Sequence, residues 1–182
     1  MSIDSKSFNA LIIGDVSFYY DLSSLNIAKD IPISLTIFII NNQGGTLDKF
    51  IGDAIVAFYG APVHMEDHAL KACVSSQLME KKLAELRIKW KVDGTWPKMV
   101  HALQHRMGMN TGEMVTGNMG SERRFNYTMM GDNVNLAARC ESGGKAYNVF
   151  TMVTESTKNE AENHGNDCLF RKLDTIVVKG RI

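Results

Sequence analysis

The sequence predicts an α/β sandwich in which helices pack against a mainly antiparallel sheet. Two observations lead to this fold class: strand-like and helical segments alternate along the chain, and hairpin-type turns separate several of the strands. A length of 182 residues, with 45% hydrophobic and 22% charged residues, is ordinary for one globular domain with a full core. The chain has no internal repeat and no linker rich in Pro, Gly or Ser, so we expect a single domain over residues 1–182.

The first strands are predicted from apolar runs that end at turn residues. Residues 8–13, FNALII, form such a run and lead towards Asp15, which places a carboxylate at a strand end. Residues 46–59 are two apolar runs divided by a Gly-Asp pair, which suits a hairpin turn. Asp53 then lies at the hairpin tip, and Lys49 lies about one strand-length before it.

A long packing helix is predicted over residues 66–90, because apolar and small side chains recur there at helical spacing. These side chains are Ala69, Cys73, Ser76, Met79, Leu83, Leu86 and Trp90. Residues 15–44 predict neither a clean helix nor a clean strand, because Pro32 lies in their middle and a β-branched run follows it.

The second half of the chain is predicted to be rich in strands. Residues 106–117 are interpreted as two strands joined through the turn residues 110–112, Asn-Thr-Gly. Residues 126–131 predict a further short strand, and residues 148–154 and 170–180 add more strand towards the end of the chain.

Another helix is predicted to begin near Asp132, a good N-cap residue, and to end near Gly143 and Gly144, which can adopt the positive φ of a C-terminal cap. Within this helix, Asn135 and Arg139 are four residues apart and therefore project from one face. A guanidinium beside an amide could bind a phosphate and a sugar, or the pair could simply form a solvated helix face.

The charge and cysteine content exclude some classes of partner and favour one compartment. Twenty Lys and Arg residues balance twenty Asp and Glu residues, so no net charge attracts nucleic acid or an anionic membrane. The three cysteines are widely spaced and form no metal-binding pair, which favours a reducing compartment. No signal-peptide pattern and no apolar stretch of membrane-spanning length is present. We therefore expect a cytoplasmic domain with no nucleic-acid partner, although a longer parent protein could be anchored to a membrane.

Several chemistry-bearing residues need one common explanation. Asp15 and Asp53 lie at strand or turn ends, Lys49 lies in the same hairpin as Asp53, and Lys179 and Arg181 lie near the terminus. Two carboxylates that approach each other can hold two Mg²⁺ ions, which prefer carboxylate and substrate phosphate oxygens. Each residue alone is more often a turn or surface residue, so only their joint occurrence with the Asn/Arg helix face favours phosphate chemistry.

Long stretches of the sequence resemble the catalytic domain of class III nucleotidyl cyclases, especially the bacterial adenylate cyclases related to the soluble mammalian type. The resemblance is carried by residues 44–62, GGTLDKFIGDAIVAFYGAP, by residues 105–149, which contain NYTMMGDNVNLAAR, and by residues 170–181, FRKLDTIVVKGR. It implies a ferredoxin-like fold and a head-to-tail homodimer whose sites contain residues of both subunits. The implied reaction converts ATP to cyclic AMP and pyrophosphate with two Mg²⁺ or Mn²⁺ ions per site, under the control of a sensor or regulatory domain.

The resemblance also implies roles for individual residues that contact the base and the metal ions. Asp53 corresponds to a metal-binding aspartate, Lys49 to the lysine that recognises adenine, and Thr128 to its partner at the base edge. Guanylate cyclases of the family typically carry Glu and Cys at the last two places. A Lys ammonium only donates hydrogen bonds, so it suits the acceptor N1 of adenine and not the protonated N1 of guanine.

Further roles follow from the same resemblance for the sugar and the phosphates. Asn135 corresponds to the asparagine that orients the ribose, and Arg139 to the arginine that stabilises the transition state. Arg106 and Arg181 fall where the family places basic contacts to the phosphates, and Lys179 is close enough in sequence to take the second of these roles.

The sequence departs from the family pattern near both ends. The first metal aspartate is assigned to Asp15, because an apolar strand leads straight into it, and Asp21 is the alternative. Residues 15–43 are shorter than the corresponding part of the family and atypical, and the chain stops where the family continues into a final strand. We therefore expect a fragment of a longer signalling protein. The alternatives to an active cyclase are a non-catalytic module that dimerises or binds nucleotide, and a metal-dependent nucleotide-binding protein with another reaction.

Overall fold

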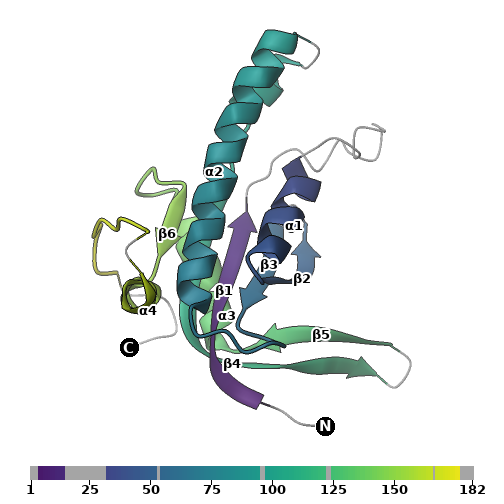
Figure 1. Ribbon diagram of the computed structural model, residues 1–182, viewed down its shortest axis with the longest axis vertical. Coiled ribbons are helices and arrows are strands. Elements are labelled where there is room, and N and C mark those ends of the chain that lie inside the picture. The colour runs from purple at the N-terminus through teal and green to yellow at the C-terminus, as the bar shows by residue number, and fades with distance from the viewer. Residues whose placement is uncertain are drawn as a thin grey trace.

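The computed structural model describes residues 4–14, 32–52, 54–94, 97–121, 124–165 and 167–176. In chain order its helices and strands (Figure 1) are β1 (Asp4–Gly14), α1 (Pro32–Asn42), β2 (Thr46–Ile51), β3 (Ala54–Tyr59), α2 (His68–Asp93), the 3₁₀ helix η3 (Lys98–Ala102), β4 (Arg106–Ser121), β5 (Arg124–Met130), α3 (Asp132–Gly143), β6 (Thr151–Val153) and α4 (Glu155–His164).

The strands form one sheet in the order β2-β3-β1-β4-β5, with β6 beside β4. All pairings between the described strands are antiparallel, except for the parallel pairing of β4 with β6. The succession β1-α1-β2-β3-α2-β4 places β1 between β3 and β4, which is the ferredoxin-like arrangement. The predicted α/β sandwich with a mainly antiparallel sheet is therefore confirmed.

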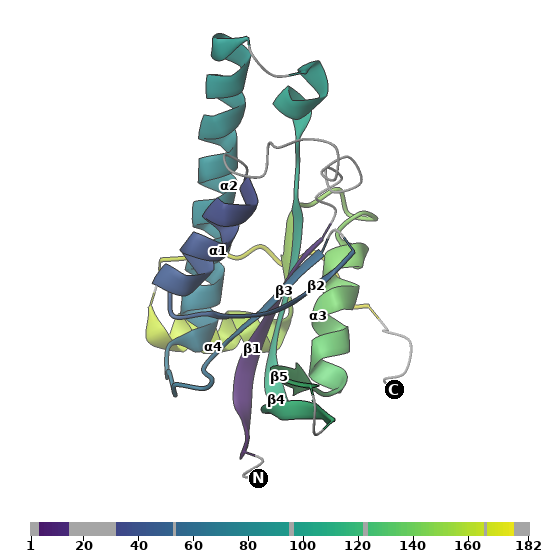
Figure 2. The same ribbon diagram turned by 90° about the vertical axis from the view of Figure 1, so that its right-hand side faces the viewer.

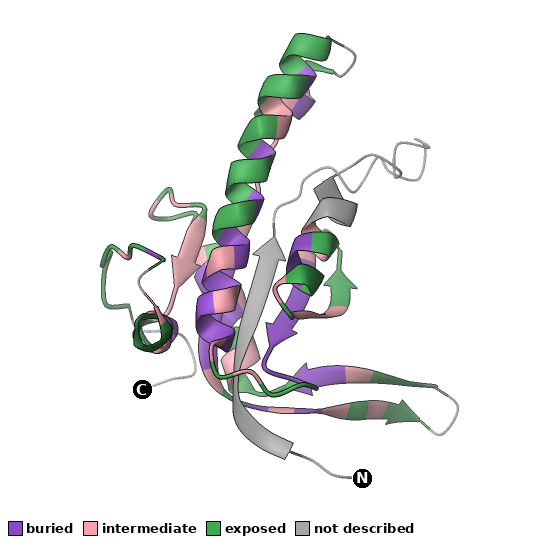
Figure 3. Cartoon of the chain, viewed as in Figure 1, coloured by how far each residue is buried: buried purple, intermediate pink, exposed green. Residues whose placement is uncertain are grey.

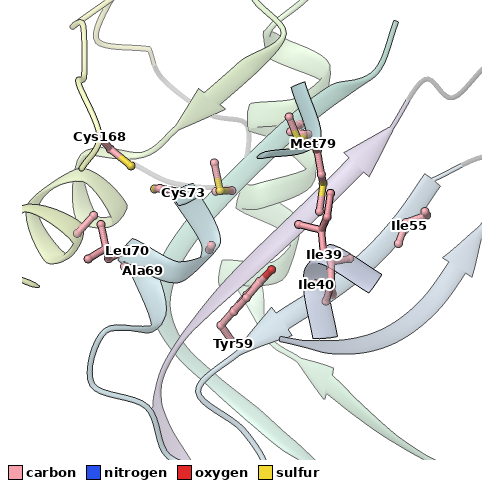
Figure 4. Close-up of a cluster of buried hydrophobic side chains, with 14 residues drawn as sticks. Ile39, Ile40, Ile55, Tyr59, Ala69, Leu70, Cys73, Met79 and Cys168 are labelled. Carbon is pink, nitrogen blue, oxygen red and sulfur yellow. The ribbon is translucent and has the colours of Figure 1, made fainter. Parts of the chain in front are cut away.

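Helices cover both faces of the sheet: α1 and α2 lie on one face and α3 on the other (Figure 2). The alternation of side chains along β3 follows these two layers. Ile55, Ala57 and Tyr59 join the core cluster beneath α1 and α2 (Figure 4), whereas Val56 and Phe58 join the cluster beneath α3. The strand β3 is therefore buried on both faces. Its side chains hold the sheet between the two helical layers.

The long packing helix is confirmed as α2. Its buried side chains gather along the stretch that lies against the sheet, and its C-terminal part is mostly exposed (Figure 3). The predicted core residues Ala69, Cys73, Ser76, Met79, Leu83 and Trp90 are buried, and Leu86 packs partly buried against Leu83 and Trp90. None of the helices in the described ranges is long and apolar enough to span a bilayer.

Most of the predicted strands are also confirmed. Residues 8–13 lie within β1, residues 46–59 form the β2–β3 hairpin, residues 126–131 largely coincide with β5, and residues 148–154 contain β6. The helix predicted near Asp132 is α3.

One strand prediction is wrong at residues 110–112, which form no turn. Residues 106–117 lie in the single continuous strand β4, and Asn110 and Thr111 are buried within it. Their polar side chains find hydrogen-bond partners in α3 and α4, so the residues that resemble a turn signal in the sequence serve tertiary contacts instead.

The end of α3 and the end of the chain also differ from the predictions. Gly144 at the C-terminus of α3 has φ of −54°, so it does not adopt the predicted left-handed conformation. A Cβ there would lie 2.9 Å from the carbonyl oxygen of Val149, so close packing explains the glycine. The strand predicted at residues 170–180 is absent from its described part, residues 170–176.

The helix α1 is not predicted by the sequence pattern. It begins at Pro32, and proline suits the first position of a helix because the N–H that it lacks would have no partner inside the helix. Ile39 and Ile40 from the β-branched run are buried against α2 and β3, so tertiary packing overrides the weak local preference for helix.

Helix α3 approaches β4 so closely that Gly108 has no room for a side chain. A Cβ on Gly108 would overlap backbone atoms of Ala137 and Glu141 in α3. Backbone atoms cannot rotate away as the end of a side chain can, so the whole helix would have to move.

Gly108→Ala is therefore expected to lower the free energy of unfolding by roughly 1–3 kcal/mol. The control is Gly117→Ala in the same strand, because no described atom lies within 4 Å of a Cβ at that position. Thermal unfolding of the two variants tests the contact. Equal melting temperatures for both variants would contradict a tight α3–β4 contact.

Candidate active site

The predicted Asn/Arg pair lies on the exposed side of α3. A sharp turn at Gly131, with φ of 146°, connects β5 to this helix. Ala137 packs against the sheet. Asn135 and Arg139 are each two residues from Ala137, so each lies roughly 200° around the helix axis from Ala137. Asn135 is exposed and Arg139 is half-buried.

Arg139 holds an unused hydrogen-bond donor. One of its terminal guanidinium nitrogens is shielded from solvent and has no hydrogen-bond partner among the described residues. A buried donor without a partner costs free energy, and a phosphate oxygen is an acceptor that suits a guanidinium. Arg139 can therefore serve an anionic ligand.

Thr128 lies near the end of β5, just before the turn into α3. Its hydroxyl oxygen is buried and also has no partner within the described part of the chain. The residue opposite it in β4 is Gly117, and the space where a Cβ of Gly117 would lie is open. A polar group of a ligand or of a second copy could satisfy this hydroxyl.

Lys49 lies in β2, at the opposite end of the strand order from Thr128. Its ammonium nitrogen is 3.3 Å from a carboxylate oxygen of Asp48, and the Lys49 side chain is 44% exposed whereas that of Asp48 is 2% exposed. The strand register shifts at Asp48, which is a β-bulge between Leu47 and Lys49. Bulges re-aim side chains near functional sites, and Lys49 is the first residue after this shift that pairs with β3.

Arg106 is the first residue of β4 and lies at the other end of α3. Its guanidinium carbon is 5.9 Å from the centre of the Phe150 ring, within the range of a cation–π contact. Burial and, secondarily, the nearby charge of Arg87 lower the pKa of His105 to about 4. His105 is therefore neutral at neutral pH and adds no positive charge beside Arg106.

The predicted metal-binding aspartates lie outside the described residues. These aspartates are Asp15, the alternative Asp21, and Asp53, and Lys179 and Arg181 also lie outside the described residues. Within the ranges that the structure describes, no group of three or more His, Cys, Asp or Glu side chains is arranged to hold a metal ion. The last residue pair between β1 and β3 is Ile13 with Ile55, so the two strands that lead to the predicted aspartates are direct neighbours.

The predicted residues that the structure describes lie on several elements, and β2, which carries Lys49, contacts β5, which carries Thr128. Asn135 and Arg139 share one face of α3, and Thr128 precedes that helix in the adjacent strand. Lys49 lies in an edge strand, and Arg106 lies near the C-terminal end of α3. These residues lie on more than one structural element. Their hydrogen-bond donors suit an anion that carries a sugar and a base.

Sequence reasoning misses two residues that connect β4 to α3, namely Asn110 in β4 and Asn133 in α3. They are 23 positions apart and hydrogen-bonded to each other. In the sequence, Asn110 is simply a polar residue among apolar ones in a strand-like segment. The same pattern is equally typical of a turn.

Comparison with a family profile gives a direct match. The profile described as "Adenylate and Guanylate cyclase catalytic domain" matches residues 38–182. Adenylate cyclase 1 of Rhizobium meliloti (strain 1021) is 29% identical over 170 residues, which are 93% of this chain and 22% of that protein. The terminal-differentiation specific adenylate cyclase of Dictyostelium discoideum is 31% identical over 142 residues, which are 78% of this chain and 6% of that protein.

Solved structures agree with the family match. The guanylyl cyclase Cya2 has a TM-score of 0.78 at 30% identity, with 99% of this chain and 89% of that chain covered. The adenylyl cyclase CyaB from P. aeruginosa also has a TM-score of 0.78, at 28% identity, with 99% of this chain and 91% of that chain covered. One of these proteins is a guanylyl cyclase and the other an adenylyl cyclase, so overall similarity does not separate the two substrates.

Proposed function

We propose that this chain, which belongs to the family of adenylate and guanylate cyclase catalytic domains, acts as an adenylate cyclase that converts ATP to cyclic AMP and pyrophosphate. The observation that carries the choice of ATP is the pair of Lys49 and Thr128. Lys49 is an exposed cation that can only donate hydrogen bonds, and Thr128 has a buried hydroxyl without a partner among the described residues.

The base is selected by the match of donors to acceptors. The ammonium group of Lys49 donates to N1 of adenine, and the hydroxyl of Thr128 contacts the same edge of the base. In guanine the N1 atom carries a proton, so this donor would face the donor group of Lys49. Two donors that face each other cannot form a hydrogen bond, so the site discriminates against that substrate.

The ribose and phosphates are held by residues of α3 and by basic residues at other elements. The side-chain amide of Asn135 orients the ribose so that its 3′ oxygen faces the α-phosphorus, and Arg139 donates to the oxygens on which negative charge develops. Arg106 and Arg181 bind the remaining phosphates, with Lys179 as an alternative to Arg181. No covalent enzyme intermediate forms, because the attacking group belongs to the substrate itself.

Asp15 and Asp53 would hold two Mg²⁺ or Mn²⁺ ions, since carboxylate oxygens are the ligands that these ions prefer. The direct pairing of β1 with β3 up to Ile13 and Ile55 supports this assignment. When bound, the ions would activate the attacking oxygen and neutralise the leaving pyrophosphate.

A head-to-tail homodimer would complete the site. The hydroxyl of Thr128 and one donor of Arg139 have no partner among the described residues, and several large apolar side chains in or beside the hairpins are exposed. These are Phe50, Ile51, Phe125 and Met130. Their burial against a second copy would remove apolar surface from water.

Control by other domains and a cytoplasmic location are part of the same proposal. The curated relatives are several times longer than the matched part of this chain, which supports a single catalytic domain regulated by a sensor in a longer protein. Three free cysteines, all buried, support a reducing compartment.

The test is cyclic AMP formation by the purified protein with ATP and either Mg²⁺ or Mn²⁺. Asp53→Ala is expected to lower the rate of cyclic AMP formation by about 100-fold or more. Loss of a residue that only orients a metal ligand already lowers metal affinity or activity about 10- to 100-fold, and loss of a ligand itself should cost at least as much. Asp93→Ala, at the exposed end of α2, is the matched control and should retain full activity. No product with either metal ion from a folded, dimeric protein would refute the proposal in favour of a non-catalytic module.

A further inference from the structure

A hydrogen-bonded pair of amide side chains connects α3 to β4. Asn110 lies in the middle of β4 and is 1% exposed. Its side-chain nitrogen donates to the carbonyl oxygen of Asn133 at 3.0 Å and to the side-chain oxygen of Asn133 at 3.1 Å. Because a backbone carbonyl can only accept, these contacts also fix the orientation of the Asn110 amide.

The other side of the Asn110 amide is satisfied as well. Its oxygen accepts hydrogen bonds from the hydroxyls of Thr154 at 2.9 Å and Ser156 at 3.3 Å. Thr154 is the N-cap of α4, and the hydroxyl of Ser156 also donates to the backbone of β4 at Thr111. All donors and acceptors of the Asn110 side chain are therefore used, which makes its burial tolerable and its position well defined.

The side chain of Asn133 is clamped between α3 and β4. It lies over Gly112, where an added Cβ would come within 2.6 Å of its amide carbon, and its nitrogen donates to the carbonyl oxygen of Glu113 at 2.8 Å. The first turn of α3 is therefore attached to β4 by hydrogen bonds at Asn110 and Glu113 and by close contact at Gly112.

This attachment lies just before the predicted ribose and phosphate ligands. Asn133 precedes Asn135 by two residues in the first turn of α3, and Arg139 follows one turn later. A small tilt or slide of this turn would therefore displace both side chains together.

We propose that Asn110 and Asn133 form a latch that fixes the first turn of α3 on β4 and thereby positions Asn135 and Arg139 for the reaction. Asn110 and Asn133 are positioning residues, since they act through α3 and do not touch substrate. This inference rests on the proposed cyclase function for its kinetic consequence, but the attachment of α3 itself can be measured without activity.

The kinetic test compares Asn110→Ala, Asn133→Ala and the double variant with the unchanged protein. We expect kcat for cyclic AMP formation to fall roughly 10- to 100-fold in each single variant, because displacement of a reacting group by about 1 Å costs up to about 100-fold. KM for ATP should change by no more than about 3-fold, because Lys49 and Thr128 still bind the base. The double variant should be no slower than the slower of the two single variants, because both changes break one latch.

The matched control is Thr111→Val, at the next residue of β4. Thr111 is also buried, and its hydroxyl donates to the hydroxyl of Thr157 in α4. The variant should lose some thermal stability but keep kcat, which separates a positioning role from general damage to the strand. Equal loss of kcat in Thr111→Val and Asn110→Ala would overturn the proposal.

A second measurement, amide hydrogen exchange of the protein without nucleotide, reports on the latch alone. Residues 134–139 should exchange about 5- to 10-fold faster in Asn110→Ala and in Asn133→Ala, but not in Thr111→Val. If the unchanged protein makes no cyclic AMP but this exchange pattern appears, the proposed function fails and the latch stands. Unchanged exchange in both asparagine variants, or unchanged kcat in an active enzyme, would overturn the latch.

Discussion

Arg139→Ala is expected to lower kcat for cyclic AMP formation by about 100-fold or more, which is the loss typical of removing one preorganised donor at a developing negative charge. One guanidinium nitrogen of Arg139 is buried and has no hydrogen-bond partner among the described residues, which motivates this prediction. KM should change little, because the interaction strengthens only as charge develops on the α-phosphate. The measurement is steady-state kinetics with ATP over a range of concentrations.

Two further variants make this result specific. Arg139→Lys keeps the charge but loses the planar fork of donors, so its kcat should lie between those of the alanine variant and the unchanged protein. Arg171→Ala removes an exposed arginine to which the proposal assigns no role, and it should leave kcat unchanged. Full activity in Arg139→Ala would remove this residue from the transition state and leave α3 without its proposed catalytic role.

Replacing Lys49 by Glu together with Thr128 by Cys is expected to change the preferred substrate from ATP to GTP. A carboxylate accepts the proton on N1 of guanine, which a Lys ammonium cannot do. We expect kcat/KM for ATP to fall by roughly 100-fold or more, because the acceptor N1 of adenine would then face a carboxylate, which is also an acceptor. Side-by-side assays with ATP and GTP measure the change.

The buried carboxylate of Asp48 affects the design of this experiment. It lies 3.3 Å from the Lys49 ammonium, so a carboxylate placed at position 49 would be repelled by it. The double change should therefore also be tested with Asp48→Asn, which removes the repulsion, and Asp48→Asn alone serves as the control. If the ATP preference survives all of these changes, Lys49 and Thr128 do not select the base.

The parts of the fold that are predictable are those that depend on local patterns. The spacing of small and apolar residues predicts α2, and the Gly-Asp pair between two apolar runs predicts the β2–β3 hairpin. Asn135 and Arg139 are four residues apart, which is close to one helical turn. This separation likewise predicts that they share one face of α3.

The parts that are not predictable depend on contacts between distant residues. Asn110 resembles a turn residue in the sequence, and its hydrogen bonds to Asn133, 23 positions later, and to Thr154 and Ser156 explain why a polar side chain is buried in β4. The helix α1 owes its stability to the packing of Ile39 and Ile40 on the core, although its sequence contains a β-branched run. The register shift at Asp48, next to Lys49, likewise depends on the pairing of β2 with β3 and not on composition.

The measurement that tests the central claim most directly is the ratio of kcat/KM for ATP to that for GTP. It requires only the unchanged purified protein, Mg²⁺ and separate quantification of cyclic AMP and cyclic GMP. An adenylate cyclase with Lys49 and Thr128 at the base should prefer ATP by about 100-fold or more. Cyclic GMP formed from GTP as efficiently as cyclic AMP from ATP would contradict the assignment.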